Sequence, residues 1–126
     1  ATEKGVLRAL KTSRLLVARC GADVVGTVRL EAKKPWAIDV AYFAKVQKAV
    51  YLHGLAVAPD AQGRGVGRLL VEEAKAVARA WPCNAIRLDA YNHAAGAAPF
   101  YVKCGFRQVG RVTYRGVPLI YFELLF

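Results

Sequence analysis

The stretch QGRGVG, residues 62–67, lies between an apolar segment at residues 52–58 and an amphipathic segment that begins near Val66. Three glycines within five positions remove the side chains from a loop that leads into the predicted helix. The backbone N–H groups of such a loop can converge on an anion, which the positive end of the helix dipole also attracts. The arrangement therefore predicts a strand, an anion-binding loop and a helix, with a pyrophosphate as the expected ligand.

Apolar runs predict the elements that flank this loop. Residues 15–19 and 24–30 are short apolar segments around a turn at residues 20–23, which is typical of a hairpin. Residues 49–58 form a continuous apolar run, as expected for a strand buried on both faces. After the loop, a helix is predicted to continue until Pro82. Its apolar residues recur at helical spacing and are Val66, Leu69, Leu70, Ala74, Val77 and Trp81.

The remaining segments complete an alternating pattern. Residues 86–91 predict a strand, residues 94–103 a helix that ends at Gly105, and residues 106–114 and 117–125 a second hairpin. The order of elements predicts an α/β fold, in which helices flank a mixed central sheet. The two strands joined by the helix after QGRGVG should be parallel neighbours, with the loop at the carboxyl end of the first. Ligand binding and chemistry are expected at that edge.

Length and composition narrow the class of protein. The 126 residues, 56% of them apolar, fit a single domain over residues 1–126. No window reaches the roughly 18 uncharged apolar residues that a membrane span requires. The three cysteines have no CxxC spacing, so neither a disulfide framework nor a zinc cluster is indicated, and no metal site is predicted. A reducing cytoplasm is the expected location.

The formal net charge of +10 raises the question of nucleic-acid binding. Residues 1–54 carry ten basic and four acidic side chains, and residues 55–126 carry nine and five, so the excess is spread evenly. A basic stripe with interleaved aromatic residues is absent from the sequence. The charge therefore favours a polyanionic cofactor over nucleic acid.

The loop departs from two common nucleotide-binding patterns. Its spacing is GxGxG, whereas a dinucleotide-binding fold has GxGxxG and a P-loop has GK followed by Ser or Thr. Together with the segment before it, the loop instead resembles the coenzyme A loop of the GNAT superfamily of acyl-CoA-dependent N-acyltransferases. Residues 100–106, FYVKCGF, resemble the FYxKxGF helix end of the same superfamily. The resemblance covers roughly residues 15–126 and implies a GNAT-like fold, with acetyl-CoA as the acyl donor.

The resemblance also implies roles for particular residues. The pyrophosphate of coenzyme A would be held by Gln62, Gly63, Arg64, Gly65, Val66, Gly67 and Arg68. The pantetheine would bind the backbone of Leu55, Ala56 and Val57, and Tyr101 would protonate the departing thiolate. Asn92 resembles an asparagine that also contacts the cofactor, although it lies nine residues before Tyr101, where seven is commoner.

Amine acylation requires groups that the sequence can supply. A backbone N–H near Leu55 or Val57 could stabilise the tetrahedral oxyanion formed when an amine attacks a thioester. A base must accept the proton of the amine, and His53 is the candidate, because histidine suits proton transfer near neutral pH. By strand alternation, His53 is expected to share a face with Tyr51, Leu55 and Val57. The alternative for His53 and for Tyr101 is a packing role, and Cys104 is interpreted as a packing residue.

The acceptor side is less well defined by the sequence. Superfamily members usually carry a strand and two helices before the hairpin that begins here at Leu15, and that segment helps to form the acceptor site. Only about fourteen residues precede it in this sequence. The N-terminal part is thus shortened, so either the acceptor pocket is more open or part of the chain is missing. The loop at residues 33–42, with Trp36, Asp39 and Tyr42, either contacts the acceptor or is an ordinary hairpin connection.

The predicted function is direct transfer of an acetyl group from acetyl-CoA to a primary amine in a ternary complex. A chain with a net charge of +10 repels lysine-rich tails and polyamines, so a small-molecule amine is the expected acceptor. Two alternatives remain: a non-catalytic acyl-CoA-binding sensor or scaffold, and a protein N-terminal or lysine acetyltransferase. The oligomeric state is open, a homodimer included.

Overall fold

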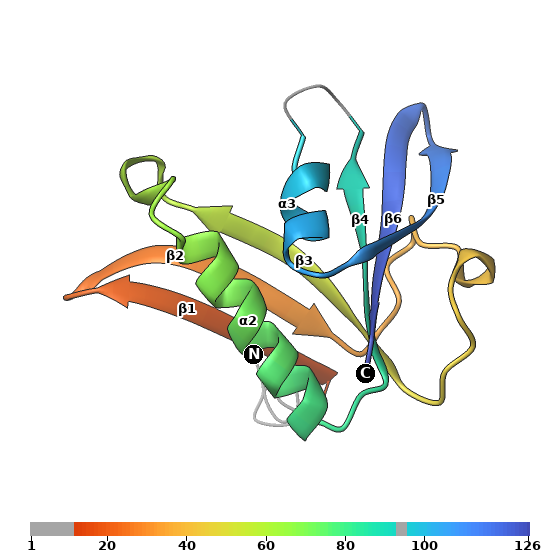
Figure 1. Cartoon of the computed structure of the whole chain (residues 1–126), viewed down its shortest axis with the longest axis horizontal. Helices are drawn as coiled ribbons and strands as arrows, with labels where there is room; N and C mark the ends of the chain where they lie inside the picture. The colour runs from red at the N-terminus through yellow and green to blue at the C-terminus, as the bar shows by residue number, and fades with distance from the viewer. Residues whose placement is uncertain (1–11, 93–95) are drawn as a thin grey trace, which may run out of the picture.

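The computed structural model describes residues 12–92 and 96–126 (Figure 1). These residues contain six strands, two α-helices and two short 3-10 helices, η1 (Val40–Tyr42) and η2 (Pro59–Ala61). The strands are β1 (Ser13–Cys20), β2 (Asp23–Glu31), β3 (Ala49–Val57), β4 (Ala85–Tyr91), β5 (Arg107–Tyr114) and β6 (Val117–Leu125). The helices are α2 (Val66–Ala80) and α3 (Ala98–Lys103). The predicted order of strands and helices is confirmed.

The strands form one mixed sheet in the order β1-β2-β3-β4-β6-β5. All neighbouring strands are antiparallel except β3 and β4, which are parallel and are connected through α2. Both hairpins form as the sequence predicts, with β5 and β6 joined through Arg115 and Gly116. The α/β fold class and the parallel central pair are thus confirmed.

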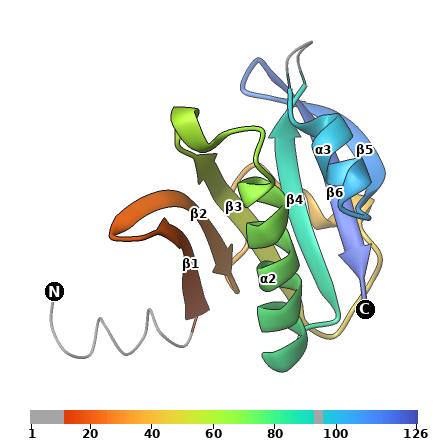
Figure 2. The ribbon, with the colours of Figure 1, turned by 60° about the vertical axis from the view of Figure 1, so that its left-hand side comes forward.

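Helix α2 contacts β1, β2 and β3 on one face of the sheet, and Figure 2 shows it in front of β3. Its buried residues are Leu70, Val71, Ala74 and Ala78. The predicted apolar stripe is wrong at Leu69, whose side chain is 65% exposed, and it omits Val71, which is fully buried. Because successive helical residues are rotated by about 100°, the buried face is centred on the Leu70–Ala74–Ala78 line, and Leu69 points away from the sheet.

Two separate apolar cores lie on the two faces of the sheet. The larger contains residues from α2 and α3 and side chains of the central strands, among them Leu52, Tyr101 and Phe122. The smaller core consists of Ile38, Phe43, Tyr51 and Tyr121, so the loop between β2 and β3 covers the second face. Both described α-helices therefore pack on the same side.

Strand β3 is not buried along its whole length, contrary to the prediction for residues 49–58. Residues Val50 to Leu52 are buried, but His53 is exposed. The three β2 residues from Thr27 to Arg29 lie opposite the four β3 residues from His53 to Ala56, so β3 carries one extra residue in this register. Gly54 lies in this bulge at φ 67°, a conformation that glycine adopts without steric strain.

The bulge reverses the alternation of side chains in the second half of β3. Leu55 packs against the core on the α2 side, whereas Tyr51 belongs to the core on the other face. The predicted sharing of one face by His53, Leu55 and Val57 is therefore wrong, because alternation holds only where the strand is regular.

Helix α3 is shorter than the predicted helix at residues 94–103. It begins at Ala98, after the N-cap residue Ala97, and Pro99 occupies its first turn. Proline fits there because the first helical N–H groups have no intrahelical acceptor and because its φ angle suits the helix. Residues 94 and 95, which the prediction included, lie outside the described residues, as does His93.

Candidate functional site

The central feature of the site is an opening between β3 and β4. The two parallel strands pair only from Ala49 with Ala85 to Tyr51 with Arg87, although β3 continues to Val57 and β4 to Tyr91. Beyond the paired residues the strands diverge, as Figure 1 shows. Ala56 and Val57 pair with β2 on their other side, so the β4-facing edge of this segment is left for a further hydrogen-bonding partner. Leu55, Ala56 and Val57, the predicted pantetheine contacts, lie on this segment.

The glycine loop follows directly at the end of β3. Gly65, with φ 82°, is the N-cap residue of α2, and no side chain caps this helix end. The first intrahelical bond of α2 runs from the Leu69 N–H to the Gly65 carbonyl oxygen at 3.0 Å. The backbone N–H groups of Val66, Gly67 and Arg68 therefore have no intrahelical acceptor, and the helix dipole adds positive potential at this end. This geometry is compatible with the predicted binding of an anion, which stays a prediction.

Gln62 fixes the loop to the end of the strand. Its side-chain Nε2 donates a hydrogen bond to the Val57 carbonyl oxygen at 3.1 Å. The amide side chain is therefore occupied by the backbone of β3, which positions the loop. A direct contact between Gln62 and a cofactor phosphate stays a prediction.

A cavity of about 390 Å³ lies beside the loop and is called the loop cavity here. Its lining comes from the end of β3, from the loop, from α2 and from α3: Val57, Ala61, Gln62, Gly63, Gly65, Val66, Gly67, Arg68, Phe100, Lys103 and Cys104. A Cβ atom at Gly67 would lie 3.4 Å from Phe100 Cζ, so a residue without a side chain keeps this part of the cavity open. Among the predicted binding residues, Arg64, Leu55, Ala56 and Asn92 are not part of this lining.

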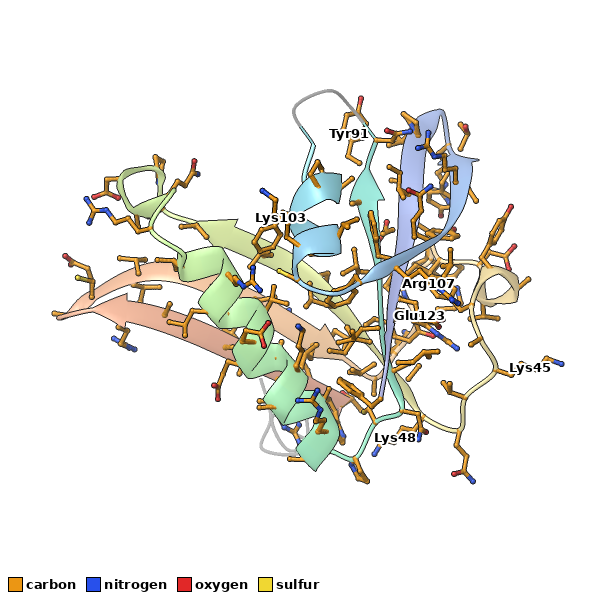
Figure 3. All side chains as sticks on the ribbon, in the orientation of Figure 1. Lys45, Lys48, Tyr91, Lys103, Arg107 and Glu123 are labelled. Atoms are coloured by element: carbon orange, nitrogen blue, oxygen red, sulfur yellow. The ribbon has the colours of Figure 1, made fainter. Side chains whose placement is uncertain are left out.

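Lys103 and Phe100 are functional candidates that the sequence reasoning missed. Both line the loop cavity from α3, and Figure 3 shows Lys103 on the side of α3 toward the N-terminal end of α2. With Arg68 on α2, Lys103 places a second positive charge beside the unpaired N–H groups. Phe100 and Lys103 are three residues apart on one short helix, and this spacing was a signal that the two side chains share a helix face.

Tyr101 lies in the main core, next to the cavity lining. Its ring contacts those of Phe100, Phe106 and Phe122, with centroid distances of 5.4, 5.9 and 5.7 Å. Burial, with smaller contributions from Cys104 and Asp89, raises the pKa of Tyr101 to about 12. The phenol is therefore protonated at neutral pH and can donate a hydrogen bond. This position fits both the predicted acid role and the packing alternative.

A second cavity, of about 450 Å³, lies on the other face of the sheet at the same opening. We call it the mixed-charge cavity, and its lining consists of Glu31, Lys33, Lys34, Pro35, Trp36, His53 and Asp89. His53 and Asp89 each lie two residues beyond the last paired positions of β3 and β4, Tyr51 and Arg87. The cavity therefore lies where the two strands begin to separate.

The predicted base His53 lies in this mixed-charge cavity. Its Nε2 is 3.7 Å from Glu31 Oε1, and its side chain is 43% exposed. Glu31 also accepts a hydrogen bond from the Ser13 hydroxyl at 3.0 Å. Burial raises the pKa of Asp89, and the nearby His53 opposes that shift. An exposed imidazole beside a carboxylate is a suitable proton acceptor, and the role of His53 as the base stays a prediction.

Several other residues singled out from the sequence have structural roles. The Asp39 carboxylate accepts a hydrogen bond from the Ala41 N–H at 3.0 Å and caps η1. Tyr42 packs its ring edgewise on Tyr121. Of the three residues predicted to contact the acceptor from the loop at residues 33–42, only Trp36, 86% exposed, lines the mixed-charge cavity. Its neighbours Lys33, Lys34 and Pro35 line the cavity as well. The Asn92 N–H donates to the Pro118 carbonyl oxygen at 2.9 Å, which fixes the end of β4.

The amino-acid sequence of the chain matches the model of a known protein family. The model of the acetyltransferase (GNAT) family matches residues 2–106. The chain belongs to the GNAT acetyltransferase family. The predicted family, its fold and its class of enzyme, an acyl-CoA-dependent acetyltransferase, are thereby confirmed. No curated protein shows significant sequence similarity to the chain.

Solved structures of GNAT acetyltransferases share the fold. A ribosomal-protein-alanine N-acetyltransferase from Brucella melitensis is similar with a TM-score of 0.77 at 21% identity, over 98% of this chain and 74% of that protein. An aminoglycoside 6'-N-acetyltransferase in complex with coenzyme A gives 0.74 at 15% identity, over 98% and 78% of the two chains. A GNAT acetyltransferase from Elizabethkingia anophelis with acetyl-CoA bound gives 0.69 at 17% identity, over 99% and 84%. The first two act on different acceptors, so the shared fold does not define the acceptor of this chain.

The described ranges contain neither a metal-binding cluster nor a helix that could cross a membrane. Residues 12–92 and 96–126 contain no cluster of three or more His, Cys, Asp or Glu side chains placed to hold a metal ion. In the same ranges, no helix has the length and apolar character needed to cross a membrane.

Proposed function

We propose that this GNAT acetyltransferase binds acetyl-CoA across the opening between β3 and β4, with the pyrophosphate in the loop cavity. The observation that carries the proposal is the coincidence of unpaired helix N–H groups with Arg68 and Lys103 at one cavity. Such groups provide several charge-assisted hydrogen bonds for a phosphate. The pantetheine would then lie along Leu55, Ala56 and Val57, where the strand edge toward β4 is unpaired over this length.

The reaction would take place where β3 and β4 separate. A neutral primary amine in the mixed-charge cavity attacks the thioester carbonyl carbon, and the resulting oxyanion accepts a hydrogen bond from a backbone N–H near Leu55 or Val57. Collapse of this intermediate breaks the carbon–sulfur bond and releases the thiolate of coenzyme A. His53 accepts the proton that the amine loses, so the products are an amide, a thiol after protonation, and the regenerated enzyme.

Tyr101 would assist the departure of the thiolate. A phenol whose pKa is raised to about 12 is a weaker acid than an ordinary tyrosine, but it is fully protonated at neutral pH. We therefore expect Tyr101 to stabilise the thiolate chiefly through a donated hydrogen bond. The thiolate then takes up a proton from solvent, and Tyr101 keeps its own. The hydroxyl contributes only as the thiolate develops, which favours the transition state over bound substrate.

Direct transfer to the amine, without an acetylated enzyme, is part of the proposal. Cys104 lines the loop cavity, but burial raises the pKa of its thiol and lowers its nucleophilicity at neutral pH. Cys20 and Cys83 line neither cavity. These positions favour a ternary complex over a cysteine-bound intermediate.

Calorimetry with acetyl-CoA, followed by a thiol-release assay with a panel of small amines, tests this function. We expect binding of acetyl-CoA and release of thiol that depends on an added amine. Absence of binding at millimolar acetyl-CoA would refute the donor site. Binding without thiol release would indicate an acyl-CoA sensor or scaffold, and faster reaction with peptide N-termini or lysine peptides would indicate a protein acetyltransferase.

A further inference from the structure

The mixed-charge cavity contains groups of both signs at its two sides. Glu31 and Asp89 contribute carboxylates near His53, and Lys33 and Lys34 contribute ammonium groups from the loop after β2. Cavities that bind small molecules usually place a few polar groups so that they fix the orientation of the ligand. Opposite charges within one cavity therefore indicate a ligand that carries opposite charges itself.

The acidic side of the cavity lies next to the reacting centre. His53 on β3 and Asp89 on β4 are on opposite strands of the opening, just beyond the last paired residues. Asp89 pairs with Tyr121 in the β4–β6 ladder, and Tyr121 belongs to the core beneath the loop, which places Asp89 on the face away from α2. A protonated amine entering from this face would be attracted to Glu31 and Asp89. It reacts only after this proton is lost to solvent, and His53 then accepts the second proton, which the amine loses as it attacks the thioester.

The basic side lies on the loop and is built into its structure. The Lys34 Nζ donates to the carbonyl oxygens of Pro35 and Ile38, at 2.9 and 2.8 Å, which fixes its positive charge beside the cavity. Lys33 is exposed and can extend toward a bound molecule. Trp36, 86% exposed, adds an aromatic surface to the cavity lining that a hydrocarbon segment can contact.

We propose that the acceptor is an amino acid or a similar small molecule with both a primary amine and a carboxylate, the amine toward His53 and Asp89 and the carboxylate toward Lys33. A polyamine would meet the two lysines, and an anion without an amine would meet Glu31 and Asp89. Only a molecule with both charges is complementary to both sides of the cavity. The inference rests on the proposed function, because it names the substrate class of the same site.

Matched pairs of amino acids and their carboxamides test this inference in the thiol-release assay. Each pair keeps the amine and the side chain and differs only in the negative charge. Rates are corrected for the unprotonated fraction of each amine, because amidation changes amine basicity. We expect kcat/KM to be about three- to fivefold higher for the acids, an effect typical of a charge that is partly screened at a cavity rim.

Lys33→Glu links the preference to a residue. The variant should lower kcat/KM for the amino acids about tenfold and change that for the carboxamides less than about twofold. Lys45→Glu is the matched control, since Lys45 is an exposed lysine outside the cavity lining and Figure 3 shows it pointing away from the sheet. It should affect acids and carboxamides equally.

The outcomes separate this inference from the proposed function. Thiol release with equal rates for acids and carboxamides, or an equal effect of Lys33→Glu on both, overturns the amino acid assignment and leaves the acetyltransferase intact. Thiol release with no amine, or no binding of acetyl-CoA by calorimetry, overturns both. A preference for acids that Lys33→Glu abolishes supports the assignment.

Discussion

The loop cavity and the mixed-charge cavity offer different kinds of groups to a ligand. The loop cavity depends on backbone N–H groups exposed by glycines, and only Arg68 and Lys103 add charge. The mixed-charge cavity depends on side chains from β2, β3, β4 and a loop. A backbone site recognises a feature common to many substrates, such as a pyrophosphate, whereas a side-chain site can change with each substitution. The comparison explains why one side of the reaction can be identified by family and the other cannot.

The largest expected effect is the loss of acetyl-CoA affinity when the backbone of the glycine loop is distorted. A β-branched residue is strained at the positive φ of Gly65, so Gly65→Val should displace the α2 N–H groups from the phosphate. Loss of two charge-assisted hydrogen bonds, each worth about 1.5–3 kcal/mol, weakens binding by roughly 100-fold or more. Calorimetry with acetyl-CoA measures this loss.

Gly116→Val is the matched control for backbone strain. Gly116 has φ 79° in the turn between β5 and β6, and a Cβ atom there, as at Gly65, would meet nothing within 4 Å. Both variants should lose similar stability, on the order of 1–2 kcal/mol, but Gly116→Val should keep its affinity for acetyl-CoA. An equal loss of affinity in the two variants would show that Gly65 acts through folding alone.

Tyr101→Phe tests the next largest effect, at the boundary between the core and the opening. It removes the hydroxyl and keeps the ring contacts, so kcat should fall about 100-fold, while the dissociation constant for acetyl-CoA changes less than about threefold. Steady-state kinetics and calorimetry measure the two quantities. An unchanged kcat with lower stability would instead establish a packing role.

The raised pKa of Tyr101 predicts a loss of stability in alkaline solution. The folded-state pKa of about 12 exceeds the unfolded value of about 10, so the protonated form is favoured by folding. Its contribution is complete below about pH 10 and is lost as the pH rises through 12, for a total of about 3 kcal/mol. Urea unfolding of the wild type and of Tyr101→Phe across this range measures the difference.

Other groups titrate in the same range and are present in both proteins. Only the difference between wild type and variant reports on Tyr101. Parallel loss of stability in the two proteins would mean that the hydroxyl is not desolvated in the folded state.

The smallest expected effect concerns the base in the mixed-charge cavity. After correction of the rates for the unprotonated fraction of the amine, His53→Ala should lower kcat/KM about tenfold and remove the remaining decline in rate on the acid side of the profile, because the imidazole is active only when neutral. The pH dependence of kcat/KM measures this. His53→Gln keeps a polar side chain that carries no base. Both variants should therefore lose the same acid-side decline in rate. An unshifted profile in His53→Ala excludes His53 as the base.

Sequence patterns were sufficient for the elements and for the family. Three glycines before an amphipathic helix, and FYVKCGF downstream, are local signals, because backbone conformation and helix ends depend on neighbouring residues. The parallel pairing of β3 and β4 also follows from a single connecting helix. Errors were confined to positions where local rules are incomplete, such as the start of α3 at Ala98, where Pro99 was the overlooked signal.

The face of the sheet on which His53 lies relative to Leu55 could not be read from alternation. One extra residue at Gly54 reverses the second half of β3, and only pairing with β2 reveals the bulge. The exposed position of Leu69 has a similar origin, since the direction from which the sheet approaches α2 defines the buried face. Both depend on contacts between segments that are distant in the sequence.

The sequence by itself determined the order of elements, the family and the anion loop, because these depend on short-range backbone geometry and spacing. The tertiary structure alone decided which charged residues meet at the opening: Glu31, Lys33, His53 and Asp89 come from segments up to 58 positions apart. They converge because β3 and β4 separate after three paired positions, and the β2–β3 loop crosses the face opposite α2. Side-chain convergence of this kind is a property of packing, which no local pattern encodes.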